Sequence, residues 1–307
     1  MYHYVRPDPE AFPAYYHLSL EDFRRQLDHF EDEYGIVDRE TFLATLRGDI
    51  ECPDGVVLTF DDGLTDHAEH VLPELERRGL WGIFYVSTGP YQQEGVLNVH
   101  RIHAMLGQYG GERTLEALRG VVSDDMIDAD ERERFREYTY TTQEESAATR
   151  VKRILNYFLS YEHRSTVLDS LESKLPDAAC SVPDLYLTTE QLESLHEADM
   201  TVGSHSVTHR LLSKLDAETQ MEEIESSFQH LETVLGTLDP KTFCYPYGGK
   251  RTYTEDTLRA LEDIGCEWAF SVEPRDITTK DLRSEPQQLP RYDCNEFPHG
   301  GASGAVE

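Results

Sequence analysis

Two pairs of side chains suited to chemistry stand out in this sequence. Asp61 and Asp62 follow an apolar run at residues 56–60 that has the pattern of a buried strand, and His205 and His209 follow a shorter run at 200–202. In α/β folds ligand sites form where strands end, so these side chains are placed to meet. Histidines four apart share one face of a helical turn, and two imidazoles with one carboxylate leave a metal ion with open coordination positions. The second carboxylate would then be free to act as a base.

Each pair alone has an ordinary explanation. An Asp-Asp pair after a strand is more often a turn or a helix cap, and two histidines in a loop are more often surface residues. Together, however, they supply the ligand set of a metal site that could activate water.

Four segments together resemble the polysaccharide deacetylase family, also called the NodB-homology or carbohydrate esterase family 4 group. They are TFDDG at 59–63, HSVTH at 205–209, FCYPYG at 243–248 and LPR at 289–291, and the resemblance extends from residue 2 to about residue 297. It implies an α/β fold of the distorted (β/α)7 barrel type and hydrolysis of the acetyl group of an N-acetylated sugar. It also implies that Asp62, His205 and His209 bind a divalent metal, while Asp61 is the general base.

The resemblance assigns further roles at the site. The backbone N–H of Tyr247 would face the developing oxyanion. The arginine that commonly begins the third motif is missing, so Arg291 is expected to pair with Asp61, the alternative being a surface arginine at a strand end. The start of the chain resembles circularly permuted members, in which a histidine precedes the TFDDG segment. His3 is therefore the expected general acid, with Asp293 as the carboxylate that orients it.

The substrate contacts and the metal are less closely specified. Tyr245 and Tyr247 of the third motif are expected to contact the sugar. His100 and His103, three apart on an expected helix, could line the sugar pocket or bind a second metal, although ordinary polar helix positions are the favoured explanation. Zn²⁺ is the favoured ion, but imidazole and carboxylate ligands also accept Fe, Co or Ni.

The surrounding sequence supplies elements that could position these residues. Strand and helix patterns alternate, with helices expected at 20–32 and 216–235 and strands at 81–86 and 242–246. The alternation stops at 98–184, which is rich in helix formers. We therefore expect a single polysaccharide-deacetylase-like domain over residues 1–307, with a helical insertion at 98–184.

Composition limits the partners. The 307 residues carry a formal net charge of −31, from 59 acidic and 28 basic residues, which argues against nucleic acid or an anionic membrane. The basic residues are mostly arginine, which suggests an acidic protein of a high-salt cytoplasm. Five dispersed cysteines without CxxC spacing indicate reduced thiols, and no long apolar segment or signal sequence is visible. These features predict a cytoplasmic protein without membrane insertion, and they leave the oligomeric state and an upstream segment open.

The preferred functional hypothesis is a metal-dependent carbohydrate N-deacetylase in surface glycan or polysaccharide metabolism. An alternative enzyme would hydrolyse a small non-sugar amide or imide at the same metal. A third hypothesis, a catalytically silent glycan-binding protein, is disfavoured because binding alone needs no base beside a metal.

Overall fold

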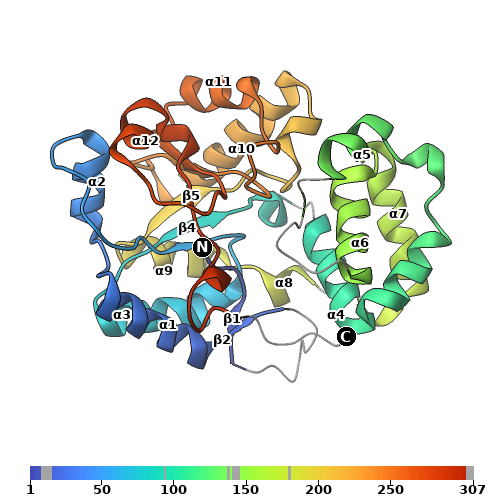
Figure 1. The fold of residues 1–307 in the computed structure, drawn as a ribbon, viewed down its shortest axis with the longest axis horizontal. Helices are drawn as coiled ribbons and strands as arrows, with labels where there is room; N and C mark the ends of the chain where they lie inside the picture. Colours follow the sequence, from blue (N-terminus) through green and yellow to red (C-terminus); the bar gives the residue numbers. More distant parts are fainter. Residues whose placement is uncertain (8–15, 93–94, 137–138, 140–145, 179–180, 302–307) are drawn as a thin grey trace. The chain divides into compact units, whose positions relative to one another are not determined.

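A computed structural model describes residues 1–7, 16–92, 95–136, 139, 146–178 and 181–301. The chain forms two compact units (Figure 1). The first contains residues 1–8, 17–95 and 182–302, and the second consists mainly of residues 96–181. The first unit carries the TFDDG, HSVTH and FCYPYG segments.

A parallel five-stranded sheet forms the centre of the first unit. Its order is β3-β4-β5-β6-β7, so neighbouring strands are consecutive in sequence. The strands are short, and their apolar side chains are buried because helices cover a parallel sheet. Their bounds are β3 Thr59–Phe60, β4 Ile83–Val86, β5 Thr201–Ser204, β6 Thr242–Cys244 and β7 Trp268–Phe270.

Segments near the two ends of the chain extend this sheet. Tyr2 pairs with Phe60 at the β3 edge, and Leu289 pairs with Phe270 at the β7 edge, both in parallel orientation. The two added segments meet, because the Met1 amine donates a hydrogen bond of 2.8 Å to the carbonyl of Tyr292. The curled sheet is thus a distorted β/α barrel, as the sequence predicted. A small parallel pair, β1 (Val5–Arg6) with β2 (Leu18–Ser19), lies beside it.

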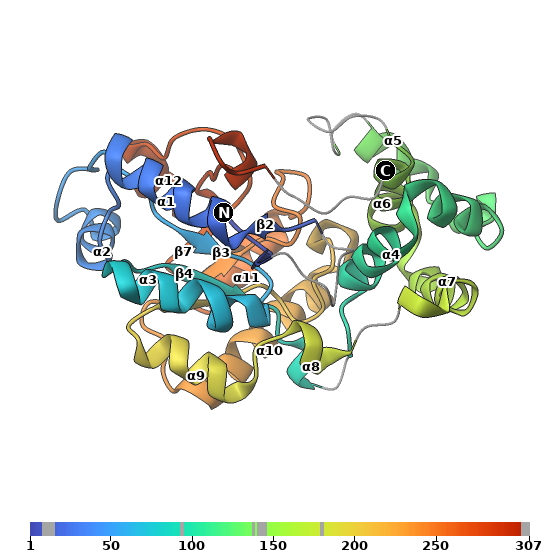
Figure 2. The ribbon, with the colours of Figure 1, turned by 90° about the horizontal axis from the view of Figure 1, so that it is seen from below.

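Helices between the strands surround the sheet (Figures 1 and 2). Several begin at a side-chain cap: Asp38, Thr188 and Asp216 each accept a hydrogen bond from the backbone N–H three residues later. The π-helix η1 (His67–Val71) continues directly into the helix α3, which begins at Leu72. The other helices of this unit are α1 Leu20–Glu33, α2 Arg39–Arg47, α3 Leu72–Arg78, α8 Val182–Leu185, α9 Thr189–Glu197, α10 Ala217–Leu235, α11 Glu255–Asp263 and α12 Thr279–Ser284, with short 3-10 turns at Gly89–Gln92, Leu212–Lys214, Pro286–Gln288 and Cys294–Glu296.

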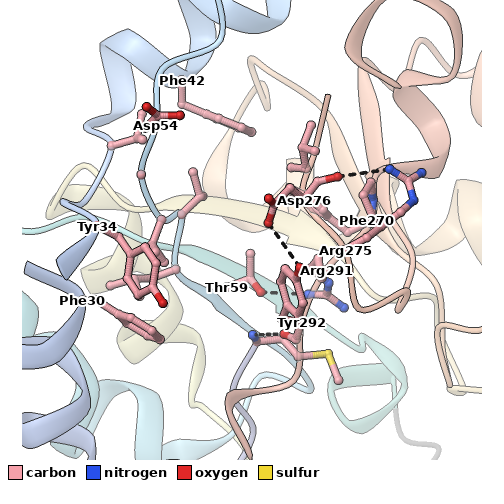
Figure 3. Close-up of a pocket in the computed structure, with 18 of the residues that line it drawn as sticks. Phe30, Tyr34, Phe42, Asp54, Thr59, Phe270, Arg275, Asp276, Arg291 and Tyr292 are labelled. Carbon is pink, nitrogen blue, oxygen red and sulfur yellow. Dashed lines mark hydrogen bonds between the residues drawn. The ribbon is translucent and has the colours of Figure 1, made fainter. Parts of the chain in front are cut away.

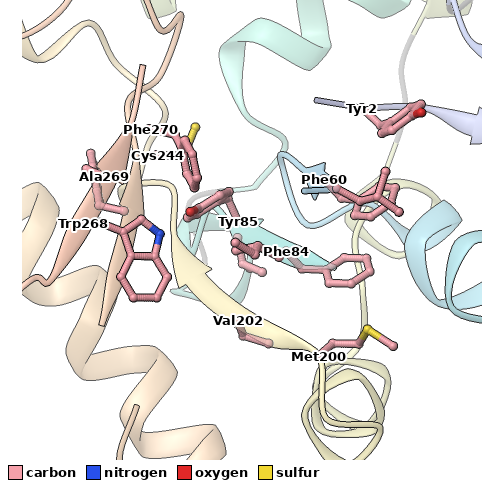
Figure 4. Close-up of a cluster of buried hydrophobic side chains, with 14 of the residues drawn as sticks. Tyr2, Phe60, Phe84, Tyr85, Met200, Val202, Cys244, Trp268, Ala269 and Phe270 are labelled. Atoms are coloured by element: carbon pink, nitrogen blue, oxygen red, sulfur yellow. The ribbon is translucent and has the colours of Figure 1, made fainter. Parts of the chain in front are cut away.

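Aromatic rings pack on the strands (Figure 4). Tyr2 stacks on Phe60 at 5.3 Å between ring centroids, and Phe60 stacks on Phe84 at 4.7 Å, so one row of rings crosses three neighbouring segments. Tyr85, the next residue of β4, is fully buried, and its hydroxyl bonds Thr242 at 2.8 Å. Because successive strand residues point to opposite faces, the aromatic row and Tyr85 belong to different faces of the sheet.

The second unit is helical, as expected from its sequence. A separate apolar cluster, with Ile102, Leu115, Val151 and Leu168 among its buried members, holds it together. Its helices are α4 Asn98–Arg119, α5 Ala129–Arg136, α6 Ala147–Arg153 and α7 Tyr161–Lys174, with a π-helix at Ile154–Phe158 and 3-10 turns at Asp124–Met126 and Pro176–Ala178. Whether it is an insertion within one domain stays a prediction.

The expected strands were generally longer than those observed. Residues 81–86 reduce to Ile83–Val86 and 242–246 to Thr242–Cys244, whereas the helices expected at 20–32 and 216–235 agree within one residue. Within the ranges that the structure describes, no helix combines the length and apolar character needed to cross a bilayer.

Candidate active site

Asp62, His205 and His209 converge at the carboxyl ends of β3 and β5. The Nε2 atoms of the two histidines lie 3.5 and 3.4 Å from Oδ1 of Asp62, and all three side chains are buried. Ligands held at about 2.1 Å from one tetrahedral ion are about 3.4 Å apart, so these separations fit a shared metal ion. The Nδ1 of His205 lies 2.7 Å from the carbonyl of Cys244; donation of its N–H there leaves the Nε2 lone pair directed at the group.

The HSVTH segment reaches this geometry as a loop. The expected helical turn is wrong, because Ser206 and His209 have left-handed backbone angles, φ +62° and +53°. The Ser206 hydroxyl accepts a hydrogen bond of 3.1 Å from the His209 N–H, which closes the loop. Asp62 and Tyr247 are also left-handed, at +81° and +63°. Four of the six described non-glycine residues with positive φ therefore lie in the three motif loops, where strain commonly marks function.

A buried glutamate that the sequence analysis missed holds the HSVTH loop. Glu223 on α10 accepts hydrogen bonds from the backbone N–H groups of Val207 (3.0 Å) and Thr208 (2.8 Å). Its other oxygen accepts from the Thr208 hydroxyl and from Arg210 Nη2 at 2.6 Å. The sequence contains one signal for this role, because Glu223 is a charged residue among the buried positions of the helix predicted at 216–235.

Asp61 is paired as the sequence analysis predicted. Arg291 donates from Nη1 to Oδ1 at 2.9 Å and from Nη2 to Oδ2 at 2.8 Å, a bidentate pair in which both residues are buried. Burial alone would raise the pKa of Asp61, but the Arg291 guanidinium outweighs it and holds that pKa well below its usual value. Cys244 completes the cluster, with Sγ 2.8 Å from Arg291 Nη2 and 3.5 Å from Asp61 Oδ2.

Burial also acts on His205. It lowers the pKa of this imidazole, while the nearby Asp61 and Asp62 carboxylates partly oppose the shift. A neutral imidazole is the form that binds metal, so the environment favours the ligand state.

The third motif contributes a loop after β6. Its Tyr247 is half-buried, and its ring meets the His209 ring edge to face at 4.9 Å. Gly248, at φ +68°, has no room for a side chain, since a Cβ would lie 2.2 Å from Val272 Cγ2. Tyr245 requires a correction, because it is only 1% exposed, stacks on Tyr253 and donates its hydroxyl to the Gln287 carbonyl. Its side chain is part of the core and is not placed to contact substrate.

The backbone at His3 lies next to Asp61, because the Asp61 N–H donates a hydrogen bond to the carbonyl of Tyr2, the residue that precedes His3. The His3 ring is close enough to Asp61 to be among the groups, after Arg291 and His205, that lower the pKa of that carboxyl. The buried His67 lies with Nε2 3.0 Å from the His3 carbonyl. Asp293 is differently engaged: its side chain caps the 3-10 turn Cys294–Glu296, and between described residues no hydrogen bond joins it to the His3 ring.

Two expected site residues belong to the second unit. His100 is fully buried near the start of α4, and His103 lies one turn further, with ring centroids 5.9 Å apart. Their roles in sugar or metal binding stay predictions.

A cavity of about 780 Å³ lies in the first unit beside the junction of the chain ends (Figure 3). Thr59 and Arg291 line it, whereas Asp62, His205 and His209 do not. Polar groups around it bond one another: the Tyr292 hydroxyl donates to Asp276, and Arg291 donates to Thr59 and Asp61. The cavity is therefore distinct from the converging ligand group.

Comparison with known proteins supports the interpretation of these motifs. The model of the family described as polysaccharide deacetylase matches residues 136–269, which include the HSVTH and FCYPYG segments. This part of the chain is therefore similar to the polysaccharide deacetylase family. The TFDDG segment precedes the matched range, but the structure brings it to the same site. A search of curated proteins found no match.

Solved structures extend the comparison to almost the whole chain. The Streptococcus pyogenes deacetylase PplD, in complex with acetate, is 16% identical, with 95% of this chain and 89% of that chain covered and a TM-score of 0.54. IcaB from Ammonifex degensii is 18% identical, with 94% and 88% covered and a TM-score of 0.52. The BpsB deacetylase domain from Bordetella bronchiseptica is 12% identical, with 95% and 94% covered and a TM-score of 0.53. At these identities the likeness establishes a shared fold.

Proposed function

We propose that this protein is a metal-dependent hydrolase that removes the acetyl group from an N-acetylated sugar. The observation that carries the proposal is the meeting of Asp62 with the Nε2 atoms of His205 and His209 at 3.4–3.5 Å, beside a second carboxylate, Asp61, that Arg291 keeps ionised. The family match supplies the substrate class.

The ligand group would hold a divalent ion, with Zn²⁺ favoured by two imidazoles and a carboxylate and Fe, Co or Ni also accepted. When bound, the ion would supply a positive centre that lowers the pKa of water and polarises the acetyl carbonyl. Asp61 would then accept a proton from the attacking water. Its pairing with Arg291 keeps the carboxylate charged and oriented for that transfer.

Two half-buried residues complete the proposed reaction. The backbone N–H of Tyr247 would donate a hydrogen bond to the oxyanion as the water oxygen bonds to the carbonyl carbon. His3 would give a proton to the sugar nitrogen as the C–N bond breaks, which releases acetate and a free amine. In this chain the hydrogen bond with His67 and the Arg6–Asp66 ion pair anchor the His3 segment, so we assign its orientation to them and not to Asp293.

Metal content and acetate release test the proposal. Purified protein treated with chelator should lose deacetylation of N-acetylglucosamine oligomers and recover it with Zn²⁺ or Co²⁺. Asp62→Ala should abolish both metal binding and activity, whereas Asp216→Ala, which removes an exposed helix cap, should retain them. Release of acetate by metal-free protein would refute the proposal.

The substrate panel should include small non-sugar amides and imides. Turnover of those alone would favour the amidohydrolase alternative, and glycan binding without turnover would favour a silent binding protein.

The cytoplasmic location and the adaptation to high salt also stay predictions. A melting temperature that rises with molar salt would support the adaptation to high salt.

A further inference from the structure

The ligand residues belong to two overlapping groups. Asp62, His205 and His209 form the first, and Asp61, His205 and Cys244 form a second whose ligand atoms also lie within 4.8 Å of one another. All are buried, and both groups contain His205. The second group adds a sulfur ligand, which Zn²⁺ and Co²⁺ accept readily as a thiolate. Ligand chemistry alone therefore does not decide which carboxylate receives the ion.

The protein's own cation occupies the second group. Arg291 Nη2 lies 2.8 Å from both Asp61 Oδ2 and Cys244 Sγ, and Nη1 lies 2.9 Å from Asp61 Oδ1. An ion bonded to these oxygen and sulfur atoms at about 2.0–2.3 Å would collide with the guanidinium and be repelled by its charge. An arginine cannot relieve this repulsion by losing its proton.

Arg291 is also held in place. Nη1 donates to the Thr59 hydroxyl at 2.9 Å, and the guanidinium carbon lies 5.7 Å from the Tyr85 ring centroid and 5.5 Å from that of Phe270. The residue is only 6% exposed, and these contacts hold its guanidinium against Asp61.

We propose that Arg291 is a positioning residue that excludes metal from Asp61 and Cys244 and confines a divalent ion to Asp62, His205 and His209. This inference rests on the proposed metal-dependent function and adds a reason why two adjacent carboxylates have different roles. Asp61 stays outside the coordination shell and available to accept a proton, and Cys244 stays a thiol.

Cobalt substitution tests the inference without an activity assay. Co²⁺ bound by thiolate has an intense near-ultraviolet charge-transfer absorption that nitrogen and oxygen ligands do not give. We expect the Co²⁺-loaded wild-type protein to lack this band. Arg291→Met should gain it, and the double variant R291M/C244S should lose it again. Arg291→Gln, which keeps a polar group without charge, should behave as R291M does and serves if R291M does not fold.

Arg275→Met is the matched control, because it removes another bidentate arginine–aspartate pair, with Asp281, from the same unit. It should show the wild-type spectrum. A thiolate band in the wild-type protein would overturn the inference, as would its absence from a folded, cobalt-loaded Arg291 variant. Failure of the wild-type protein to bind cobalt at all would instead refute the proposed metal site.

Discussion

Replacing Glu223 with glutamine tests whether the proposed metal site depends on the hydrogen bonds that Glu223 makes to the HSVTH loop. The carboxylate has four hydrogen-bonding partner groups: two backbone N–H groups, the Thr208 hydroxyl and the Arg210 guanidinium. Glutamine preserves the shape but directs an NH₂ group at donors. Losing a buried charge of this kind costs about 3–5 kcal/mol. Because the Arg210 side chain is 33% exposed, we expect a smaller loss of unfolding free energy, about 2–4 kcal/mol.

The same change should loosen the loop that carries His209. Residues that orient metal ligands without touching the metal typically contribute about 10–100-fold to affinity, and we expect a loss of this size for E223Q. Denaturant unfolding of the metal-free protein would measure stability. Competition with a chromogenic chelator would measure zinc affinity, under conditions in which the variant is folded.

Glu74→Gln is the matched control. Glu74 is equally buried, and it pairs with Arg24, Arg77 and Arg78. These ion pairs join helices α1 and α3 and do not involve Asp62, His205 or His209. It should lose stability but keep wild-type zinc affinity. If E223Q also kept wild-type affinity, the claim that Glu223 positions the loop would be refuted.

Three further outcomes are expected. Asp61→Asn should keep its metal but lower kcat for acetate release by about 10²–10⁴-fold, and full turnover would exclude Asp61 as the base. His3→Ala should lower kcat without changing zinc affinity, and unaltered kinetics would remove its assignment as the acid. Burial tends to raise the pKa of Glu74, but hydrogen bonds from Arg77, Arg78 and Arg24 prevail and lower it from 4.5 to about 2. The unfolded state therefore binds more protons than the folded state between these two pH values. The stability that ionised Glu74 gives to the folded state is thus present above about pH 4.5 and is lost as pH falls towards 2. Acid titration of unfolding should show a shallower decline for E74Q over this interval, and identical curves would contradict the shift.

The convergence of Asp62, His205 and His209 and the barrel could be predicted because they depend on local patterns. Apolar runs that end in Asp61 and Asp62, and helices with recognisable caps, place side chains at strand ends whatever their exact length. The pairing of Asp61 with Arg291 was also expected, since a missing arginine in one motif left a carboxylate in need of a partner.

The remaining features depend on contacts between distant segments. The sequence shows that Glu223 is charged on an apolar helix, but only the fold shows that the HSVTH loop lies over it. Tyr245 was misjudged because motif position does not determine which face of the chain a side chain takes after a two- or three-residue strand. The HSVTH loop was misjudged because a spacing of four suits a helix, whereas its backbone adopts left-handed angles at Ser206 and His209.

Those left-handed angles lower the stability of the fold at residues that the proposed active site requires. Glycine would relax the backbone at 62, 206, 209 and 247, yet it would delete two of the proposed metal ligands and the hydroxyl that accepts a hydrogen bond from the His209 N–H. A screen that ranks variants by heat resistance alone would therefore select changes that remove residues of the proposed active site. A selection for more stable variants should therefore measure turnover as well as melting temperature, or it should leave these four positions unchanged.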